Sequence, residues 1–357
     1  MECKYWKYAI QLLLPTMIFL YACVNENQTA ELALQGVEDV EFVAWVTGPE
    51  STSHTYEKYD VHGADLGSMF TQDDTLYLAF GDTFSCCRPP QGGAGGARWR
   101  SNTLAFTTDR ELEDGILFDG MITGPRGRAR QILQRFPGDI TIIPTYGIAI
   151  GNRLYLHYMS VARWGPRPGH WTLHRSGWAY SDNNGWQWTQ PGDAIWEGDT
   201  HFGQVALVRH GEYVYVFGIH GGRNSGVALA RVRPDDILDM GAYRYWNGKG
   251  WVPELGAAIE VASAPVGELS VAWNNYLNRW IMTYLDEDQH AIVIREAKHL
   301  TGPWSKPQIL VPADDYPASY GAYLHPWASD GEVIYFNMSQ WGPYAVRLMR
   351  ARLVKVR

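Results

Sequence analysis

The chain has 357 residues and a formal net charge of −8, so it is long enough to bury a large core. Its 16 Trp, 21 Tyr and 11 Phe suit the packing of sheets against one another and the lining of a groove. No run of basic residues occurs, so the charged surface that holds nucleic acid is missing, and we expect no nucleic-acid partner.

The first 22 residues have the pattern of an export signal. Two lysines precede a mostly apolar stretch, residues 9–22, that is too short and too interrupted for a transmembrane helix. The stretch ends in Ala22-Cys23, which resembles a bacterial lipobox, in which the cysteine carries the lipid; an ordinary cleaved signal is the alternative. We expect an exported lipoprotein of the outer membrane or cell surface of a bacterium, anchored through Cys23, with residues 23–39 as a tether.

From residue 40 onward, one strand pattern returns five times, and further strand patterns flank each copy. Aromatic and aliphatic residues alternate in each copy, which indicates a strand with one buried face. The copies are LYLAFGDTF at 76–84, LYLHYMSV at 154–161, YVYVFGIH at 213–220, WIMTYLD at 280–286 and VIYFNMSQW at 333–341. Repeats of about four strands are typical of propellers. The sequence therefore predicts an all-β fold, a five-bladed β-propeller over residues 40–357.

The two ends of this region carry one alternating strand each. Val40–Val46 precedes the first blade, and Ala345–Val356 ends the last one. Pairing the two strands would close the ring and remove two exposed sheet edges.

Cys86 and Cys87 are adjacent, and the sequence leaves open whether they form a disulfide. Neighbouring Cα atoms lie about 3.8 Å apart, below the usual disulfide window of about 4.4–6.8 Å, so a bond between them would be strained. Two unbonded loop thiols are the alternative. No second pair of ligands lies near them, and we expect no metal ion and no cofactor.

One mouth of the central channel gathers polar residues. In a propeller blade, the first strand starts on the face where the antiparallel second strand ends, so both positions share a rim. The second strands end at Asp82, Ser160, His220, Asp286 and Gln340. The first strands are aligned to start near Asp65, Thr145, Gln204, Glu268 and His325. All ten are polar on otherwise apolar strands, which predicts a site for a polyhydroxylated ligand.

Three of these rim residues are acids that fit catalysis. Asp65 and Asp82 lie on neighbouring strands of the first blade, and Glu268 lies across the channel. Glycoside hydrolysis needs one protonated and one ionised carboxyl group, and crowding acids on one rim separates their pKa values. Taken singly, each acid could instead cap a turn or bind calcium. We expect these three to be catalytic, and the residues that bind a polysaccharide substrate to be Arg100, Thr145, Tyr146, Gln204, His220, Tyr320, His325, Gln340 and Trp341.

Two loop motifs bear on the predicted fold and on the predicted site. Ser181–Trp188 resembles the Asp-box turn of sialidases and related propellers, with Asn183 in the aspartate position, and indicates a hairpin. The glycine-rich segment 92–96 lacks the lysine of a phosphate-binding loop, so we expect it to border the site.

The motifs DLG, FGDTF, GELSVAWN and HPW…SQWGPY, from Asp65 to Tyr344, resemble the domain-of-unknown-function family 4185. Members of that family have been reclassified as glycoside hydrolase family 183, endo-D-arabinofuranosidases that cut the D-arabinan of mycobacterial arabinogalactan and lipoarabinomannan. The resemblance implies a five-bladed propeller with catalytic aspartates at Asp65 and Asp82. The segment 86–98 departs in length and glycine content, which bears on substrate choice.

Two other functions compete with an endo-acting glycosidase. A non-catalytic carbohydrate-binding propeller would use amides, hydroxyls and aromatic rings and would not need three rim acids. A sialidase-like enzyme would need an arginine cluster for its anionic sugar, and the ten rim positions contain no arginine.

Overall fold

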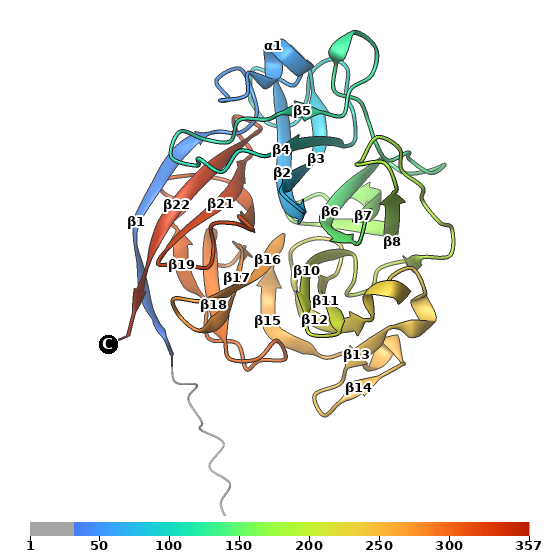
Figure 1. The fold of residues 1–357 in the computed structure, drawn as a ribbon, viewed down its shortest axis with the longest axis vertical. Coiled ribbons are helices and arrows are strands. Elements are labelled where there is room, and N and C mark those ends of the chain that lie inside the picture. The colour runs from blue at the N-terminus through green and yellow to red at the C-terminus, as the bar shows by residue number, and fades with distance from the viewer. Residues whose placement is uncertain (1–31, 357) are drawn as a thin grey trace, which may run out of the picture. The chain divides into compact units, whose positions relative to one another are not determined.

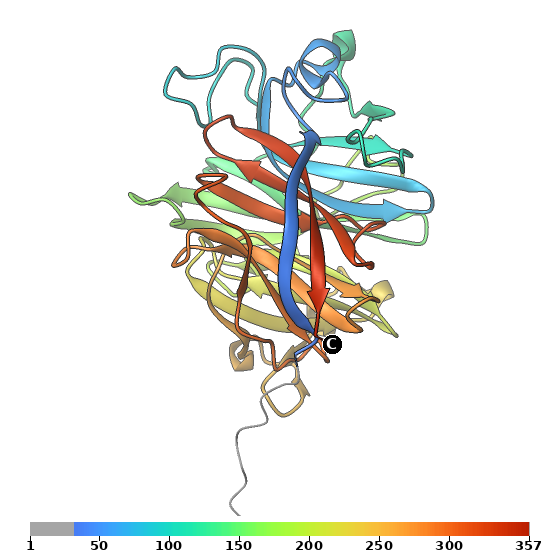
Figure 2. The same cartoon turned by 90° about the vertical axis from the view of Figure 1, so that its left-hand side faces the viewer.

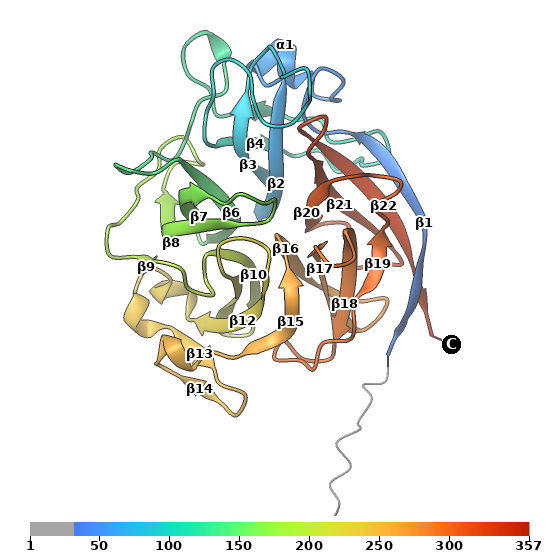
Figure 3. The same ribbon diagram turned by 180° about the vertical axis from the view of Figure 1, so that it is seen from behind.

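The structure is a computed structural model that describes residues 32–356, and these form five antiparallel sheets around a central axis (Figure 1). The predicted five-bladed β-propeller is therefore confirmed, and the ring is equally clear from behind (Figure 3). The expected export signal and Cys23 lie outside the described residues. Within residues 32–356, no helix is both long and apolar enough to cross a membrane.

Blades one to four each take consecutive strands of the chain. Blade one contains β2 (Gly63–Gln72), β3 (Thr75–Phe84), β4 (Thr103–Thr107) and β5 (Gly120–Met121). Blade two contains β6 (Thr141–Ile150), β7 (Arg153–Trp164), β8 (Trp171–Ser181) and β9 (Ile195–Glu197). Blade three contains β10 (Gln204–His210), β11 (Tyr213–Ile219), β12 (Ser225–Val232), β13 (Arg244–Trp246), β14 (Trp251–Val252) and β15 (Glu260–Val266).

Blade four contains β16 (Leu269–Asn274), β17 (Arg279–Asp286), β18 (Ala291–Ala297) and β19 (Gln308–Val311). Blade five contains β20 (Ser319–Leu324), β21 (Val333–Gln340), β22 (Ala345–Lys355) and β1 (Leu34–Trp45). Helices are few and short: α1 (Thr55–Tyr59) and the single turns η1 (Pro125–Gly127), η2 (Pro234–Asp236), η3 (Met240–Ala242) and η4 (Leu255–Ala257).

The ring is closed by strands from both chain ends, as predicted. β1 pairs with β22 from Leu34 opposite Lys355 to Trp45 opposite Arg347, and Figure 2 shows the two strands side by side. β1 begins earlier than the predicted Val40, so residues 34–39, expected in the tether, belong to the propeller. The main-chain N–H groups of Ala33 and Leu34 donate to the buried Glu296 carboxylate at 2.6 and 2.9 Å, which attaches the strand to blade four.

The inner strands are buried on both faces, whereas the sequence pattern predicted one buried face. On β3, Leu76, Leu78 and Phe80 join the larger core cluster, while Tyr77 and Ala79 join a second cluster shared with blade two. Successive side chains of a strand point to opposite faces, so each face packs on a neighbouring blade. The apolar residues of every blade therefore serve two interfaces.

The Asp-box-like segment forms the hairpin turn that was expected after β8. Asn183 Oδ1 accepts hydrogen bonds from Ser181 Oγ at 3.0 Å and from the Gln187 N–H at 2.8 Å. The indole N–H of Trp188 donates to the Gly185 carbonyl at 2.8 Å. An amide oxygen therefore fills the role of the motif's usual carboxylate in ordering the turn.

Candidate active site

Asp65 and Asp82 come together at one mouth of the propeller. Asp65 lies near the start of β2 and Asp82 near the end of the antiparallel β3. The Asp65 carboxylate lies over Gly81, where an added Cβ would stand only 2.4 Å from Asp65 Oδ1. A residue larger than glycine at position 81 would therefore displace the Asp65 carboxylate.

A β-bulge directs Asp65. The pairing of β2 with β3 shifts register on both sides of Leu66, and both Leu66 (φ 66°) and Gly67 (φ 77°) have left-handed backbones. The Leu66 N–H donates to Ser339 Oγ at 2.7 Å, and Asn337 Nδ2 donates to the Gly67 carbonyl at 3.0 Å. A left-handed leucine is strained, and such strain collects at functional sites. Hydrogen bonds from blade five thus stabilise this strained backbone, and the strained backbone directs Asp65 toward the mouth.

Asp65 is held as a neutral acid near neutral pH. Its Oδ2 accepts a hydrogen bond from the Tyr320 hydroxyl at 3.1 Å, and its Oδ1 is buried with no hydrogen-bond partner among the described residues. Burial, and then the charge of Asp82, raise the pKa of Asp65 to about 8. The side chain is still partly exposed at the mouth. The two oxygens of Asp65 therefore differ, with Oδ2 held by the Tyr320 hydroxyl and Oδ1 buried.

Asp82 has a different environment. Its Oδ1 accepts hydrogen bonds from Trp99 Nε1 at 2.8 Å and from Thr141 Oγ1 at 2.7 Å. Burial raises the pKa of Asp82 to about 6, while these hydrogen bonds and the Arg135 guanidinium oppose the rise. Asp82 is consequently mostly ionised at pH 7, beside a protonated Asp65. Two carboxyl groups in opposite protonation states are what acid–base chemistry requires.

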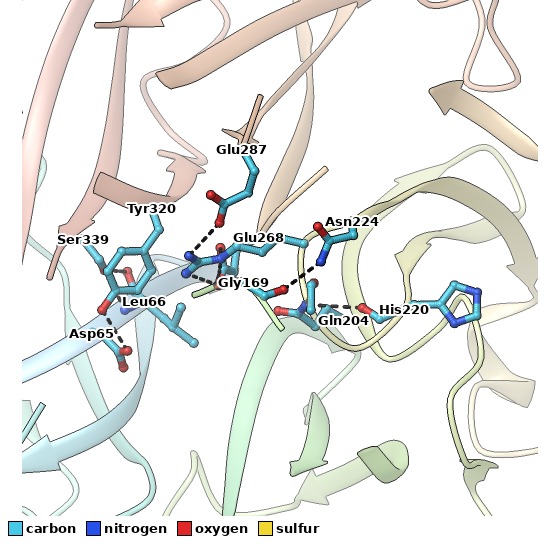
Figure 4. A network of polar contacts seen from close by, with 12 residues as sticks. Asp65, Leu66, Gly169, Gln204, His220, Asn224, Glu268, Glu287, Tyr320 and Ser339 are labelled. Atoms are coloured by element: carbon cyan, nitrogen blue, oxygen red, sulfur yellow. Dashed lines mark hydrogen bonds and ion pairs between the residues drawn. The ribbon is translucent and has the colours of Figure 1, made fainter. Parts of the chain in front are cut away.

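Glu268 precedes β16 of blade four and lies on the same side of the network as Asp65 and Tyr320 (Figure 4), and Arg223 forms an ion pair with it. Arg223 Nε donates to both carboxylate oxygens of Glu268 at 3.0 and 3.1 Å, Nη2 donates to Oε1 at 2.9 Å, and Nη1 donates to Glu287 at 3.2 Å. Burial alone would lower the pKa of Arg223, but Glu268 and Glu287 raise it above its usual value. Its guanidinium carbon also lies 4.9 Å from the centre of the Tyr320 ring. Glu268 therefore positions a fixed cation next to the partner of Asp65.

Below the mouth, the inner strands fill the channel with tyrosines. The Tyr146 hydroxyl hydrogen-bonds to Ser270 Oγ at 3.2 Å, and its ring centre lies 6.2 Å from that of Tyr323. Both tyrosines are buried, and they come from blades two and five. The site is thus a mouth with a closed floor.

Several other predicted rim residues bond to their own surroundings. The contacts are Thr145 Oγ1 with His157 Nδ1 at 2.7 Å, Gln204 Nε2 with the Gly222 carbonyl at 2.8 Å, His220 Nδ1 with Asp199 at 3.2 Å, and Gln340 Nε2 with the Pro317 carbonyl at 3.1 Å. Ser160 donates to Asp139 at 2.6 Å, and Asp286 accepts the N–H groups of its own turn. In Figure 4, Gln204 lies between Glu268 and His220, and the His220 ring points away from Glu268.

Two predicted substrate-binding residues lie elsewhere. His325 follows the far end of β20, since it is Ser319, at the near end, that pairs with Gln340 at the mouth. The predicted start of this strand was about five residues too far along the chain, because its apolar pattern looks alike when it is shifted along the strand. Arg100 is buried and donates to the carbonyls of Asp60 and Ala129 at 2.9 and 3.2 Å, so its guanidinium holds outer loops.

Trp341 is 51% exposed, and the glycine-rich segment 92–96 lies against it, since a Cβ on Gly93 would stand 2.7 Å from its indole nitrogen. This segment follows Cys86 and Cys87, which are free thiols in the structure. The segment that was expected to border the site therefore lies next to an exposed aromatic ring.

The sequence reasoning missed Thr141 and the role of Arg223. Thr141 opens β6 ahead of the apolar run, a polar start that the alignment assigned to Thr145. Arg223 lies on the loop before β12 and carried no strand signal. Within residues 32–356, no three His, Cys, Asp or Glu side chains are arranged to hold a metal ion.

The molecule is thus a five-bladed propeller with a pair of unlike aspartates at its mouth. The chain belongs to the family described as domain of unknown function DUF4185, whose profile matches residues 50–350. It is similar to notoamide biosynthesis cluster protein J of an Aspergillus species, 30% identical over 57% of this chain and 56% of the relative, so that match spans little more than half the relative's length. The J′ protein of Aspergillus versicolor is 27% identical over 79% of both chains.

Solved structures share the fold at low sequence identity. A putative hydrolase from Bacteroides ovatus has a TM-score of 0.58 at 14% identity and covers 82% of this chain and 86% of its own. An exo-β-1,3-galactanase from Phanerochaete chrysosporium, with bound galactotriose, has a TM-score of 0.53 at 11% identity, covering 90% and 65%. A family 117 glycoside hydrolase from Zobellia galactanivorans has a TM-score of 0.50 at 10% identity, covering 89% and 90%.

Proposed function

We propose that this protein is a glycoside hydrolase in which Asp65 is the general acid and Asp82 the nucleophile or general base. The observation that carries the proposal is that two aspartates lie on neighbouring strands at the mouth in unlike surroundings, which raise the pKa of Asp65 to about 8 and that of Asp82 to about 6. The acid must give a proton to the leaving oxygen, and the second carboxylate must attack the anomeric carbon or activate water. A carbohydrate-binding protein has no need to keep one buried carboxyl protonated.

The surrounding groups support these roles. Trp99 and Thr141 both donate to one oxygen of Asp82, so the other oxygen is left to face the substrate. The Tyr320 hydroxyl holds Oδ2 of Asp65, and the Arg223–Glu268 pair fixes a positive charge beside that tyrosine. A fixed charge and fixed dipoles at the mouth need no reorganisation during the reaction.

For the substrate, we propose an endo-acting enzyme of D-arabinan. The resemblance to endo-D-arabinofuranosidases supports this choice, and so does the exposed Trp341 ring, whose face could stack on a sugar beyond the cleaved one. The related folds of glycoside hydrolases show that a propeller of this shape accommodates oligosaccharide chemistry in other proteins.

The test compares Asp65→Asn and Asp82→Asn on arabinogalactan, lipoarabinomannan and a panel of other polysaccharides, with released oligosaccharides as the readout. Loss of the acid or the base should reduce turnover by about 10²- to 10⁴-fold. Asp286→Asn is the matched control, since this rim acid only caps its own turn. If both site variants turn over like wild type, other residues catalyse the reaction, and if the wild-type protein binds a polysaccharide without releasing oligosaccharides, the protein is a carbohydrate-binding propeller instead.

We also propose that Cys23 carries a lipid anchor, because Ala22-Cys23 resembles a lipobox. Replacing Cys23 with Ser should move the protein from the membrane fraction to the soluble exported fraction. Unchanged fractionation would exclude the anchor and leave an ordinary cleaved signal.

A further inference from the structure

A second groove lies at the opposite end of the strands from the aspartates. It has a volume of about 660 Å³ and lies between blades three and four, with the lining residues Arg209, Tyr215, Trp251, Trp273, Trp280 and Lys298 among its walls. β10 runs from Gln204 at the mouth to His210 beside this groove, so the two sites are about 20 Å apart at roughly 3.3 Å per residue. The groove is separate from the candidate active site.

The floor of the groove presents aromatic rings. Trp273 and Trp280 pack edge to face with ring centres 5.2 Å apart, and Tyr215 and Trp251 do the same at 5.8 Å. The indole N–H of Trp273 is already bonded to Asn275 at 3.0 Å, so its ring face is what remains for a ligand. Tyr215, Trp251 and Trp273 are all half-buried, which gives a firm, concave apolar surface.

The rim of the groove is basic. Arg209, His210, Lys298 and His299 are all exposed around it, and the described lining includes no aspartate or glutamate. The side chain of Arg209 makes no hydrogen bond or ion pair within residues 32–356. Such a lining is unexpected in a chain of net charge −8 and complements a negative ligand.

We propose that this groove binds an anionic saccharide, with the sugar face on the tryptophans and its carboxylate or sulfate on Arg209 and its basic neighbours. The volume fits a short oligosaccharide, since ligand pockets measure about 300–1,000 Å³. A lipid surface fits less well, because tryptophans that enter a membrane interface protrude, whereas these line a hollow. The groove is thus a secondary glycan site, independent of hydrolysis at the mouth.

The experiment uses the full chain carrying Asp65→Asn and Asp82→Asn, so that binding is measured without turnover and independently of the proposed function. Calorimetry compares trigalacturonate, a sulfated carrageenan oligosaccharide and neutral galactotriose. Either anionic probe should bind at least about tenfold more tightly than the neutral one, about 1.4 kcal/mol for the charged contact. The stronger of the two anionic probes identifies carboxylate or sulfate as the recognised group.

Arg209→Glu and Trp273→Ala, made separately, should each weaken binding of the better anionic probe at least about tenfold. Arg209 is exposed, so its variant tests the site even if the tryptophan variant unfolds. Lys58→Ala and Trp186→Ala are the matched controls, an exposed cation on α1 and a 43% exposed tryptophan on the loop after β8, both outside the groove. Equal affinity for acidic and neutral probes, wild-type binding by both groove variants, or binding only to phosphatidylserine vesicles would each overturn the proposal.

Discussion

At the scale of single residues, two aspartates of ordinary chemistry acquire different behaviour from their neighbours. Asp65 has one hydroxyl donor and a buried oxygen without a partner, whereas Asp82 has an indole and a hydroxyl donor on one oxygen. Burial raises the pKa of both, and hydrogen bonds to the charged form oppose the rise at each of them. The division between acid and base therefore follows from the charges around each carboxyl group, since the charge of Asp82 raises the pKa of Asp65 and the Arg135 guanidinium lowers the pKa of Asp82.

This division predicts a bell-shaped pH profile of kcat/KM. Activity should rise as Asp82 ionises near pH 6 and fall as Asp65 loses its proton near pH 8. Thr141→Val removes a donor from Asp82, so the pKa of Asp82 should rise and the acidic limb should move to higher pH while the alkaline limb stays. A profile of the variant that superimposes on the wild-type profile would show that Asp82 is not the titrating base.

The raised pKa of Asp65 also predicts that the stability of the folded protein depends on pH. Its folded-state pKa of about 8 exceeds the ordinary value of about 3.9, so between these values the folded state binds more protons than the unfolded state. This contribution is full below about pH 4 and is lost as pH rises to about 8. Asp65→Asn removes the buried charge, so its melting temperature relative to wild type should be higher at pH 8.5 than at pH 5. An equal difference at both values would mean that Asp65 is not protonated in the folded protein.

At the scale of elements, the β2 bulge depends on the neighbouring blade. Ser339→Ala should leave the buried Leu66 N–H without an acceptor and cost about 1–3 kcal/mol of unfolding free energy. It should also lower kcat, because the bulge presents Asp65. Ser68→Ala, on β2 itself, is the control. The buried Ser68 hydroxyl has no hydrogen-bond partner among the described residues, so its loss should be nearly neutral. Denaturant unfolding and turnover measure both effects, and equal costs for the two variants would contradict this role of Ser339.

The strands could be predicted from the sequence, while the contacts between blades could not. Period-2 patterns give the strands and thereby place Asp65 and Asp82 on adjacent strand ends. His325 was misplaced because an apolar strand between two blades reads alike in either phase. Thr141 and Arg223 reach the acids from other blades, and only the packing of the blades brings them within hydrogen-bonding distance, while Trp99 reaches Asp82 from a loop of the same blade.

At the scale of the whole molecule, the ring depends on the strand that closes it. Glu296 is 2% exposed and accepts the N–H groups of Ala33 and Leu34, so it joins blade four to the start of β1. Because an amide has one acceptor oxygen, Glu296→Gln should lose one of these bonds, cost about 1–3 kcal/mol, and increase hydrogen exchange in β1 before other strands. Unchanged exchange in β1, with the loss of stability spread over all blades, would assign Glu296 to general packing.

The pairing of β1 with β22 also sets how the propeller responds to a pulling force. The strands are antiparallel, and Leu34 lies opposite Lys355, so both ends of the described chain leave the sheet at the same point. A load between the two ends therefore acts across the strands and opens them one residue pair at a time, like a zipper, instead of shearing all their hydrogen bonds together. Under tension β1 would separate from β22 at low force, before the blade that carries the aspartates begins to unfold.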